Sequence, residues 1–162
     1  MKPLIAIAGK SGAGKTTLAE ALSSRYGIPR DSFAAPIRWA LMELGVKAPY
    51  PRQLLQGMGM LLRAWNPDHF IELLALRNAE RHQTGLVIDD LRFPNEYQWL
   101  RQHGFLVVYI EGSFRPLQGA EAEHESEHSL SPELVPFDLV LPAGSTVAQR
   151  VVAVASLLDA VD

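Results

Sequence analysis

Near its N-terminus the chain passes from an apolar run into a glycine-rich turn, and then into a segment with helical spacing. The apolar run covers residues 4–8, the turn holds Gly9, Gly12 and Gly14, and the helical segment begins at Lys15. Residues 9–16 match G-x-x-x-x-G-K-T, the Walker A pattern of phosphate-binding loops. Glycine permits the positive φ angles that turn successive backbone N–H groups inward, and a helix N-terminus adds positive dipole at the same point. The pattern therefore predicts an α/β domain that binds nucleotide phosphates.

Within this loop, Lys15 has the position of the lysine that reaches the β- and γ-phosphates, and the Thr16 hydroxyl that of a Mg²⁺ ligand. We expect ATP as the nucleotide and Mg²⁺ as its metal ion. The residues predicted to hold the phosphates are Gly9, Ser11, Gly12, Ala13, Gly14, Lys15, Thr16 and Thr17.

Length and composition bound the rest of the prediction. The 162 residues, 48% hydrophobic and 20% charged, suit a single globular domain covering residues 1–162. The chain has no cysteine, which excludes disulfides and thiolate metal sites. Neither a signal peptide nor an apolar run of about twenty residues is present, so we expect a cytoplasmic enzyme without a membrane span.

Charge is unevenly distributed along the chain. Residues 1–110 carry 13 Lys and Arg against 9 Asp and Glu, whereas residues 111–162 carry 2 against 9. The basic excess thus lies in the same part of the chain as the predicted phosphate loop. Of the 15 basic residues 11 are arginine, whose guanidinium can donate two hydrogen bonds to one phosphate. A genome that favours arginine codons would explain the arginine bias equally well. The acidic last third does not favour a surface that coats nucleic acid.

Apolar periodicity and the turn residues predict strands that alternate with helices. This order favours a three-layer α/β/α fold with a mainly five-stranded parallel sheet, whose ligands bind at the carboxyl ends of the strands. The Thr146–Gln149 pair is typical of a capping box at the start of the last helix. The expected strands cover residues 4–8, 31–34, 86–90, 105–110 and 137–141, and the expected helices 15–26, 37–44, 52–65, 67–84, 94–103 and 147–160.

The helix expected at residues 52–65 has two distinct faces. At 100° per residue, one face collects Leu54, Leu55, Met58, Leu61, Leu62 and Trp65. The other face collects Arg52, Gln56, Gly59 and Arg63. We expect the apolar face to pack inward, which leaves the polar face toward either a cleft or bulk water.

Two aspartates end the apolar strand at residues 86–90. Asp90 has the placement of a carboxylate that orients Mg²⁺ together with Thr16, and Asp89 competes with it because neighbours in a strand point to opposite sides. A helix-capping role is the alternative for either. Arg92, two residues further on, could fork onto a second phosphate, or form a surface ion pair.

Several motifs, taken in order, carry a resemblance to a known family. After the Walker A loop come Phe-Ala-Ala-Pro-Ile-Arg at 33–38, Leu-Gln-Gly-Met-Gly at 55–59 with Arg63, and Asp-Leu-Arg-Phe-Pro-Asn-Glu at 90–96. His-Glu-Ser-Glu at 124–127 and the stretch 137–145 follow. The chain resembles the phage deoxynucleoside monophosphate kinases over nearly its whole length. The Walker A loop and the D-x-R-F-x-N-E element are its specific motifs.

The resemblance implies a P-loop kinase fold and transfer of the γ-phosphoryl group of ATP to a deoxynucleoside 5′-monophosphate, giving the diphosphate for phage DNA precursor synthesis. It implies an acceptor-binding helical segment at about 36–84 and a lid-like loop at about 112–136. The catalytic residues would be Lys15, Asp90, Arg92 and, in the lid, Arg115, with Thr16 and Asp90 at the metal. The acceptor would be held by Phe33, Arg38, Gln56, Gly59, Arg63, Arg92 and Glu96. No role follows for the segment 124–127.

Three other functions remain open at this point. The chain could phosphorylate a hydroxymethylated base in DNA, although the acidic last third does not suit a DNA groove. It could phosphorylate another small metabolite, or act as a nucleotide-binding switch, although the N-K-x-D element that reads guanine in GTPase switches is missing. The sequence leaves open the accepted base, the exclusion of ribose, ATP or GTP as donor, and a homodimer.

Overall fold

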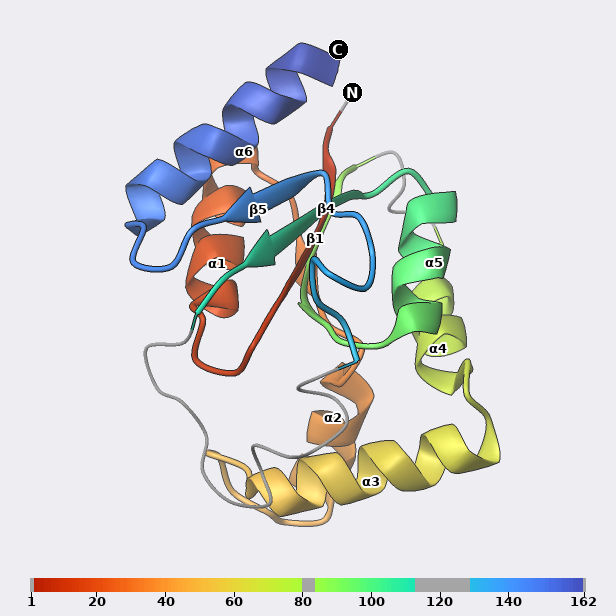
Figure 1. Ribbon diagram of the computed structural model, residues 1–162. Helices are drawn as coiled ribbons and strands as arrows, with labels where there is room; N and C mark the ends of the chain where they lie inside the picture. The colour runs from red at the N-terminus through yellow and green to blue at the C-terminus, as the bar shows by residue number, and fades with distance from the viewer. Residues whose placement is uncertain (1, 80–83, 113–128, 162) are drawn as a thin grey trace.

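The computed structural model describes residues 2–79, 84–112 and 129–161. In this part of the chain a five-stranded sheet is combined with six helices (Figure 1). The strands are β1 (Leu4–Gly9), β2 (Arg30–Asp31), β3 (Leu86–Leu91), β4 (Leu106–Ile110) and β5 (Leu139–Leu141). The helices are α1 (Lys15–Tyr26), α2 (Ala35–Glu43), α3 (Arg52–Trp65), α4 (His69–Arg77), α5 (Pro94–Gln102) and α6 (Val147–Val161).

The sheet is parallel throughout, with strand order β2-β3-β1-β4-β5. The first strand lies at the centre, where Ala6 pairs with Ile88 of β3 on one side and with Val107 of β4 on the other. Because β1 is buried on both faces, it consists of small and branched apolar residues only. Its carboxyl end opens directly into the glycine-rich loop, which therefore sits at the middle of one edge of the sheet.

Helices cover both faces of the sheet, and the predicted three-layer α/β/α fold is confirmed. Leu18 and Leu22 of α1 and Val154 of α6 pack on one face, against side chains such as Ile5 and Val87. Side chains of α2, α4 and α5 pack on the other face. Figure 1 shows α3 crossing below the carboxyl ends of the strands, next to α2. No helix in the described part of the chain is both long enough and apolar enough to span a bilayer.

Several element boundaries differ from the sequence-based expectation. The second strand is reduced to Arg30–Asp31, and the helix expected at 67–84 becomes α4, His69–Arg77. Asn66 explains the later start, since its side-chain oxygen accepts the N–H of Asp68 at 3.1 Å in a turn that precedes the helix. Asn78 closes the other end by donating from Nδ2 to the Leu74 carbonyl at 2.9 Å. The capping box at α6 is confirmed, because Thr146 and Gln149 exchange side-chain to backbone hydrogen bonds.

The packing of α3 corrects one expectation. Only part of its apolar face turns inward: Leu55, Met58 and Leu62 contact the core, whereas Leu61 and Trp65 are 72% and 73% exposed. The helix is rotated so that Gly59, on the polar face, is its buried residue. The polar face is turned toward the body of the protein and not toward bulk water.

Candidate functional site

The glycine-rich loop after β1 has the backbone conformation that its sequence predicts. Gly9, Gly12 and Gly14 have φ angles of 139°, 76° and 90°. A Cβ at Gly9 would lie 2.6 Å from the carbonyl oxygen of Ile110, so no larger residue fits beside β4. Lys15 is 8% exposed, and its Nζ donates to the carbonyls of Gly9 and Lys10 at 2.6 and 2.8 Å. The lysine is thus held over the mouth of its own loop.

A buried arginine from the last helix fixes the back of this loop. Arg150 is 2% exposed, and its Nη1 donates to the carbonyl of Ala13 at 2.8 Å. Its Nε donates to Oγ of Ser145, in the turn before α6, at 2.9 Å. Burial lowers the pKa of this guanidinium. The sequence analysis missed Arg150, and nothing in the local pattern marks it, because its partner Ala13 is 137 positions away.

Asp89, at the end of β3, faces the phosphate loop. It takes a hydrogen bond from the Thr16 side chain, and its pKa is raised by burial and by the neighbouring Asp90 charge. Asp89 and Thr16 line one cavity together with Lys15. We refer to this hollow over the loop as the loop cavity; its lining is Ser11, Gly12, Gly14, Lys15, Thr16, Thr17, Arg38, Asp89, Asp90 and Arg92.

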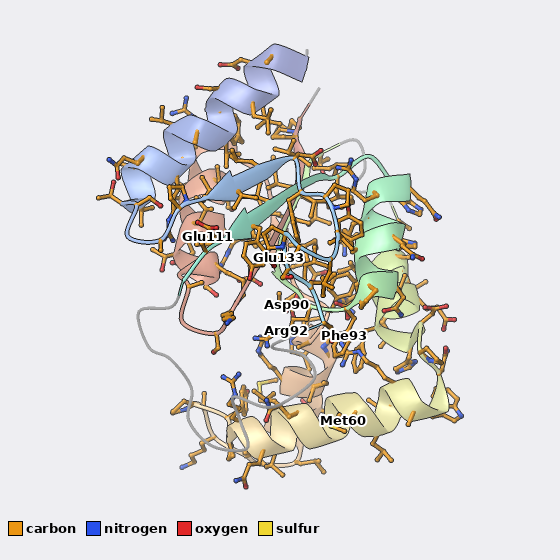
Figure 2. All side chains as sticks on the ribbon, viewed as in Figure 1. Met60, Asp90, Arg92, Phe93, Glu111 and Glu133 are labelled. Atoms are coloured by element: carbon orange, nitrogen blue, oxygen red, sulfur yellow. The ribbon has the colours of Figure 1, made fainter. Side chains whose placement is uncertain are left out.

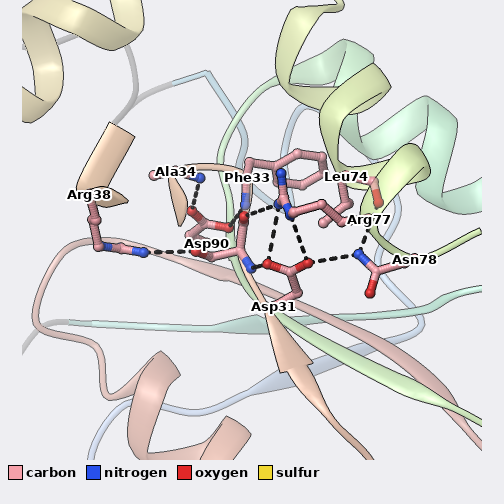
Figure 3. Close-up of polar contacts among 9 residues, drawn as sticks. Asp31, Phe33, Ala34, Arg38, Leu74, Arg77, Asn78 and Asp90 are labelled. Atoms are coloured by element: carbon pink, nitrogen blue, oxygen red, sulfur yellow. Dashed lines mark hydrogen bonds and ion pairs between the residues drawn. The ribbon is translucent and has the colours of Figure 1, made fainter. Parts of the chain in front are cut away.

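The Asp90 carboxylate, which also lines the loop cavity, binds backbone. Its two carboxylate oxygens accept the N–H groups of Phe33 and Ala34 at 2.8 and 2.9 Å, at the start of α2 (Figure 3). This is the capping arrangement that the sequence analysis left as an alternative. The carboxylate that contacts Thr16 is thus that of Asp89, and the assignment of Asp90 to the metal stays a prediction.

A polar network fixes the turn between β2 and α2 from its other side. Asp31 accepts hydrogen bonds from Arg77 at 3.2 Å and from Asn78 at 2.7 Å, while Arg77 also donates to the Ser32 carbonyl at 2.9 Å (Figure 3). The Ser32 hydroxyl in turn accepts Nη1 of Arg38 at 2.7 Å. The backbone of this turn is thus fixed by Arg77 and Asp90, and the Ser32 hydroxyl orients Arg38.

A second cavity lies between α2, α3 and the end of β3, and we refer to it as the helix cavity. Figure 2 shows Asp90, Arg92 and Phe93 above it and Met60 on α3. Its apolar lining is Ala34, Ile37, Leu55, Met60 and Phe93. Its polar lining is Arg38, Arg52, Gln56, Arg63, Asp90 and Arg92, and Gly59 supplies backbone.

The four predicted residues of α3's polar face thus meet in one cavity. Gln56 is notable because its Nε2 is buried and has no hydrogen-bond partner among the described residues. A buried, unpaired amide donor costs about 1–3 kcal/mol, a cost that an acceptor atom of a bound ligand would remove.

Arg63 is held by three neighbours. Its guanidinium lies 4.5 Å from the ring centroid of Phe70 and 4.1 Å from that of Phe93, and its Nη2 donates to Glu96 at 2.8 Å. Glu96 is 1% exposed, and burial raises its pKa to about 7 although Arg63 opposes the shift. Glu96 also accepts the backbone N–H groups of Arg92 and Phe93.

Two residues predicted to touch a ligand have another role in the structure. The Phe33 side chain is 1% exposed in the core, and only its backbone takes part in the site. Glu96 is buried behind Arg63 and does not line the cavity. Arg115 and the segment 124–127 lie outside the described residues, as does most of the loop at 112–136.

The loop cavity and the helix cavity share three lining residues, Arg38, Asp90 and Arg92. They therefore adjoin, with two arginines and one carboxylate at their junction. Arg52, to which the sequence analysis assigned no role, lines the helix cavity and bonds to Ser11 of the loop cavity. Its helical register with Gln56, Gly59 and Arg63 was the signal that could have assigned it.

Known proteins are similar to this chain in sequence and in fold. No family model matches the chain. A protein of Acanthamoeba polyphaga mimivirus, provisionally named a deoxynucleotide monophosphate kinase, is 27% identical over an alignment of 192 positions that covers 96% of each chain.

Two solved structures are similar over the whole fold. A gluconokinase from Sinorhizobium meliloti matches with a TM-score of 0.59 at 18% identity, over 98% of this chain and 93% of its own. A shikimate kinase from Aquifex aeolicus matches with a TM-score of 0.57 at 14% identity, over 96% and 95%. The chain thus has the P-loop kinase fold, and its resemblance to deoxynucleoside monophosphate kinases extends from motifs to a full-length alignment.

Proposed function

We propose that the protein is an ATP-dependent kinase that phosphorylates a deoxynucleoside 5′-monophosphate to the diphosphate. The observation that carries this proposal is the pair of adjoining cavities. One is formed by a phosphate-binding loop, and the other has an apolar wall, an unpaired amide donor and several arginines. Two anionic ligands placed in them would meet at Arg38 and Arg92, where transfer of a phosphoryl group requires cations.

The loop cavity suits the triphosphate of the donor. The residues Gly9–Thr17 would hold its phosphates through backbone N–H groups, and Lys15 would release its two carbonyls to reach the β- and γ-phosphates. The chemistry of the lining fits Mg²⁺, since Thr16 offers a hydroxyl and Asp89 a carboxylate side by side. When bound, Mg²⁺ would neutralise part of the phosphate charge. No group of three His, Cys, Asp or Glu gathers among the described residues, so most other ligands would be phosphate and water oxygens.

The helix cavity suits the acceptor. Arg38 and Arg92 at the junction would bind its 5′-phosphate, and Arg63 would contribute a fixed positive charge on the α3 side. The nucleobase would lie against Ile37, Leu55 and Met60, with an oxygen or ring nitrogen accepting from Gln56. The mimivirus relative supports a deoxynucleotide as this acceptor.

An acceptor panel tests the proposal. Purified protein is incubated with ATP and Mg²⁺ and each of the four deoxynucleoside monophosphates, the four ribonucleoside monophosphates and hydroxymethyl-dCMP, and ADP and diphosphate formation are followed. Gluconate, shikimate and DNA with a hydroxymethylated base belong in the same panel. We expect diphosphate from at least one deoxynucleotide. Turnover with gluconate, shikimate or DNA and none with any nucleotide would overturn the proposal.

A further inference from the structure

Arg52 connects the two cavities directly. It is the first residue of α3, and its Nη1 donates to Oγ of Ser11 at 2.9 Å. Ser11 lies in the phosphate loop and lines the loop cavity, whereas Arg52 lines the helix cavity. One side chain of the acceptor-side helix therefore ends on the donor-side loop, although 41 positions separate the two residues.

Arg52 lines the cavity that a phosphoryl group in transit would enter, and it contacts a lining residue of the cavity that the group would leave. A phosphoryl group that moves from the loop cavity to the helix cavity passes the junction lined by Arg38, Asp90 and Arg92. The bond from Nη1 of Arg52 to Ser11 goes to an uncharged hydroxyl. A phosphate oxygen accepts an N–H group of a charged guanidinium more strongly than a hydroxyl oxygen does.

We propose that Arg52 is a catalytic residue that contacts the phosphoryl group during its transfer. The inference rests on the proposed function. In that reaction an oxygen of the acceptor's 5′-phosphate forms a new bond to the γ-phosphorus. The bond from this phosphorus to the β,γ-bridging oxygen breaks, and its electron pair stays on the β-phosphate of the leaving ADP. No proton or further reactant is required.

The planar guanidinium is suited to this position. Its N–H groups can serve two oxygens at once, so Arg52 can exchange Ser11 for the equatorial oxygens of the group in transit. Its charge would then stabilise the transition state more than either ground state, which raises kcat and not affinity. The alternative is a purely structural role, here called a strut, in which Arg52 fixes Ser11 and with it the shape of the phosphate loop.

Four variants separate these two roles: Arg52→Ala, Arg52→Lys, Ser11→Ala and Gln53→Ala. Gln53 is the matched control, because it is exposed and follows Arg52 on the same helix. For each variant, kcat, both KM values and the dissociation constant of a fluorescent ADP analogue are measured, after circular dichroism has shown that the fold is kept. Transfer by Arg52→Ala is also measured with added methylguanidinium.

A catalytic Arg52 predicts a fall in kcat of about 10²–10³-fold in Arg52→Ala, with the KM for ATP and the ADP affinity within about threefold of wild type. Arg52→Lys recovers only part of the rate, methylguanidinium restores part of it to Arg52→Ala, and Ser11→Ala loses less than about tenfold. A strut predicts that Ser11→Ala is as damaging as Arg52→Ala and that methylguanidinium has no effect. Either of those results, or an unchanged kcat in Arg52→Ala, overturns the inference.

Hydrolysis of ATP without an acceptor keeps this test distinct from that of the proposed function. If the wild type hydrolyses ATP but phosphorylates no nucleotide in the panel, the acceptor assignment fails alone. Arg52 is then tested by the same ratios on transfer to water, where a catalytic role again predicts a loss in kcat without a loss in ADP affinity. Equal ATPase rates in Arg52→Ala and wild type would contradict it.

Discussion

Glu96 and Arg63 form a buried ion pair in which Nη2 of Arg63 donates to Oε1 of Glu96 at 2.8 Å, while Oε2 receives the N–H groups of Arg92 and Phe93. One carboxylate thus joins α3, through Arg63, to the turn that follows β3. Because Arg63 also lies between the rings of Phe70 and Phe93, its guanidinium is fixed before any ligand binds. A prepositioned cation saves the entropy that a mobile side chain would lose on binding an anion.

The raised pKa of Glu96 predicts a pH-dependent stability. The pKa of about 7 in the folded state lies above the ordinary value of 4.5, so between these two pH values the folded state holds a proton that the unfolded state has lost. The contribution of Glu96 is therefore fully present below pH 4.5 and is lost as pH rises through 7. Relative to Glu96→Gln, which cannot titrate, the wild type should lose on the order of 3 kcal/mol of unfolding free energy over this range. Urea unfolding of both proteins at pH 4.5, 6 and 8 measures the difference; a constant difference would contradict the prediction.

Lys15→Ala should abolish transfer without unfolding the protein. The Nζ atom donates to the carbonyls of Gly9 and Lys10 in its own loop, whereas in the proposed reaction it would face growing phosphate charge. We expect a loss in kcat of at least about 10²–10³-fold with a melting temperature near that of wild type. Lys10→Ala is the control, since that side chain is exposed beside the same loop. Appreciable turnover by Lys15→Ala would exclude this lysine from the chemistry.

Asp89→Asn and Asp90→Asn should fail in different ways. Asp89 lies beside Thr16, so its loss should raise the Mg²⁺ concentration needed for half-maximal activity. Asp90 accepts two backbone N–H groups, and an asparagine would turn an N–H₂ toward one of them, at a cost of about 1–3 kcal/mol. Activity against Mg²⁺ concentration and thermal melting, measured on both variants, check this. A shifted Mg²⁺ requirement in Asp90→Asn alone would restore the assignment made from sequence.

Gly59→Ala should weaken acceptor binding while leaving the fold as stable as before or more so. The added Cβ would lie 3.0 Å from Nη1 of Arg63, which its ring and Glu96 contacts keep from retreating. Alanine in a helix is favoured over glycine by about 1 kcal/mol, which offsets the crowding. Gly57→Ala is the matched control, because its Cβ would meet nothing within 4 Å. We expect a several-fold rise in the acceptor KM for Gly59→Ala alone; equal kinetics of the two variants would show that the helix cavity does not hold the acceptor.

Gln56→Ala should alter the preference among nucleobases more than the rate with the best one. Its buried Nε2 offers one donor to a base edge, and such a bond contributes about 0.5–1.5 kcal/mol, or up to about tenfold in kcat/KM. Arg63→Ala should instead lower kcat/KM for every acceptor by about 10- to 150-fold, with the KM for ATP nearly constant. Specificity constants for the active deoxynucleotides measure both effects. Parallel losses for all bases in Gln56→Ala would mean that it does not read the base.

The sequence predicted well those features of the structure that depend on a short segment alone. The loop after β1 and the bounds of α3 agree with the expectation, because glycine spacing and helical periodicity are local. Which of Asp89 and Asp90 lies next to Thr16, by contrast, depends on contacts between distant segments. Alternation along a strand turns their side chains in different directions, but only the assembled structure shows that Asp89 contacts Thr16 and that Asp90 accepts the backbone N–H groups of Phe33 and Ala34.

The rotation of α3 and the role of Arg150 were beyond the sequence for related reasons. Hydrophobic periodicity assumes one buried face, yet α3 contacts the core with one edge of its apolar face and a cavity with its polar face, so Leu61 and Trp65 stay exposed. In the sequence, Arg150 is one charged residue in a helix, and nothing around Ala13 indicates that its carbonyl accepts a hydrogen bond from a side chain. Contacts between distant segments leave no mark in the pattern of either segment alone.

The bond between Arg150 and Ala13 also bears on how the protein is made. The phosphate loop is translated before α6, and chains begin to fold while they emerge from the ribosome. The carbonyl of Ala13, however, gains its buried partner only when α6 has been synthesised, and β1 gains its neighbours only with β3 and β4. A nascent or truncated chain that ends before α6 therefore has the sequence of the nucleotide-binding loop without the contact that fixes its back.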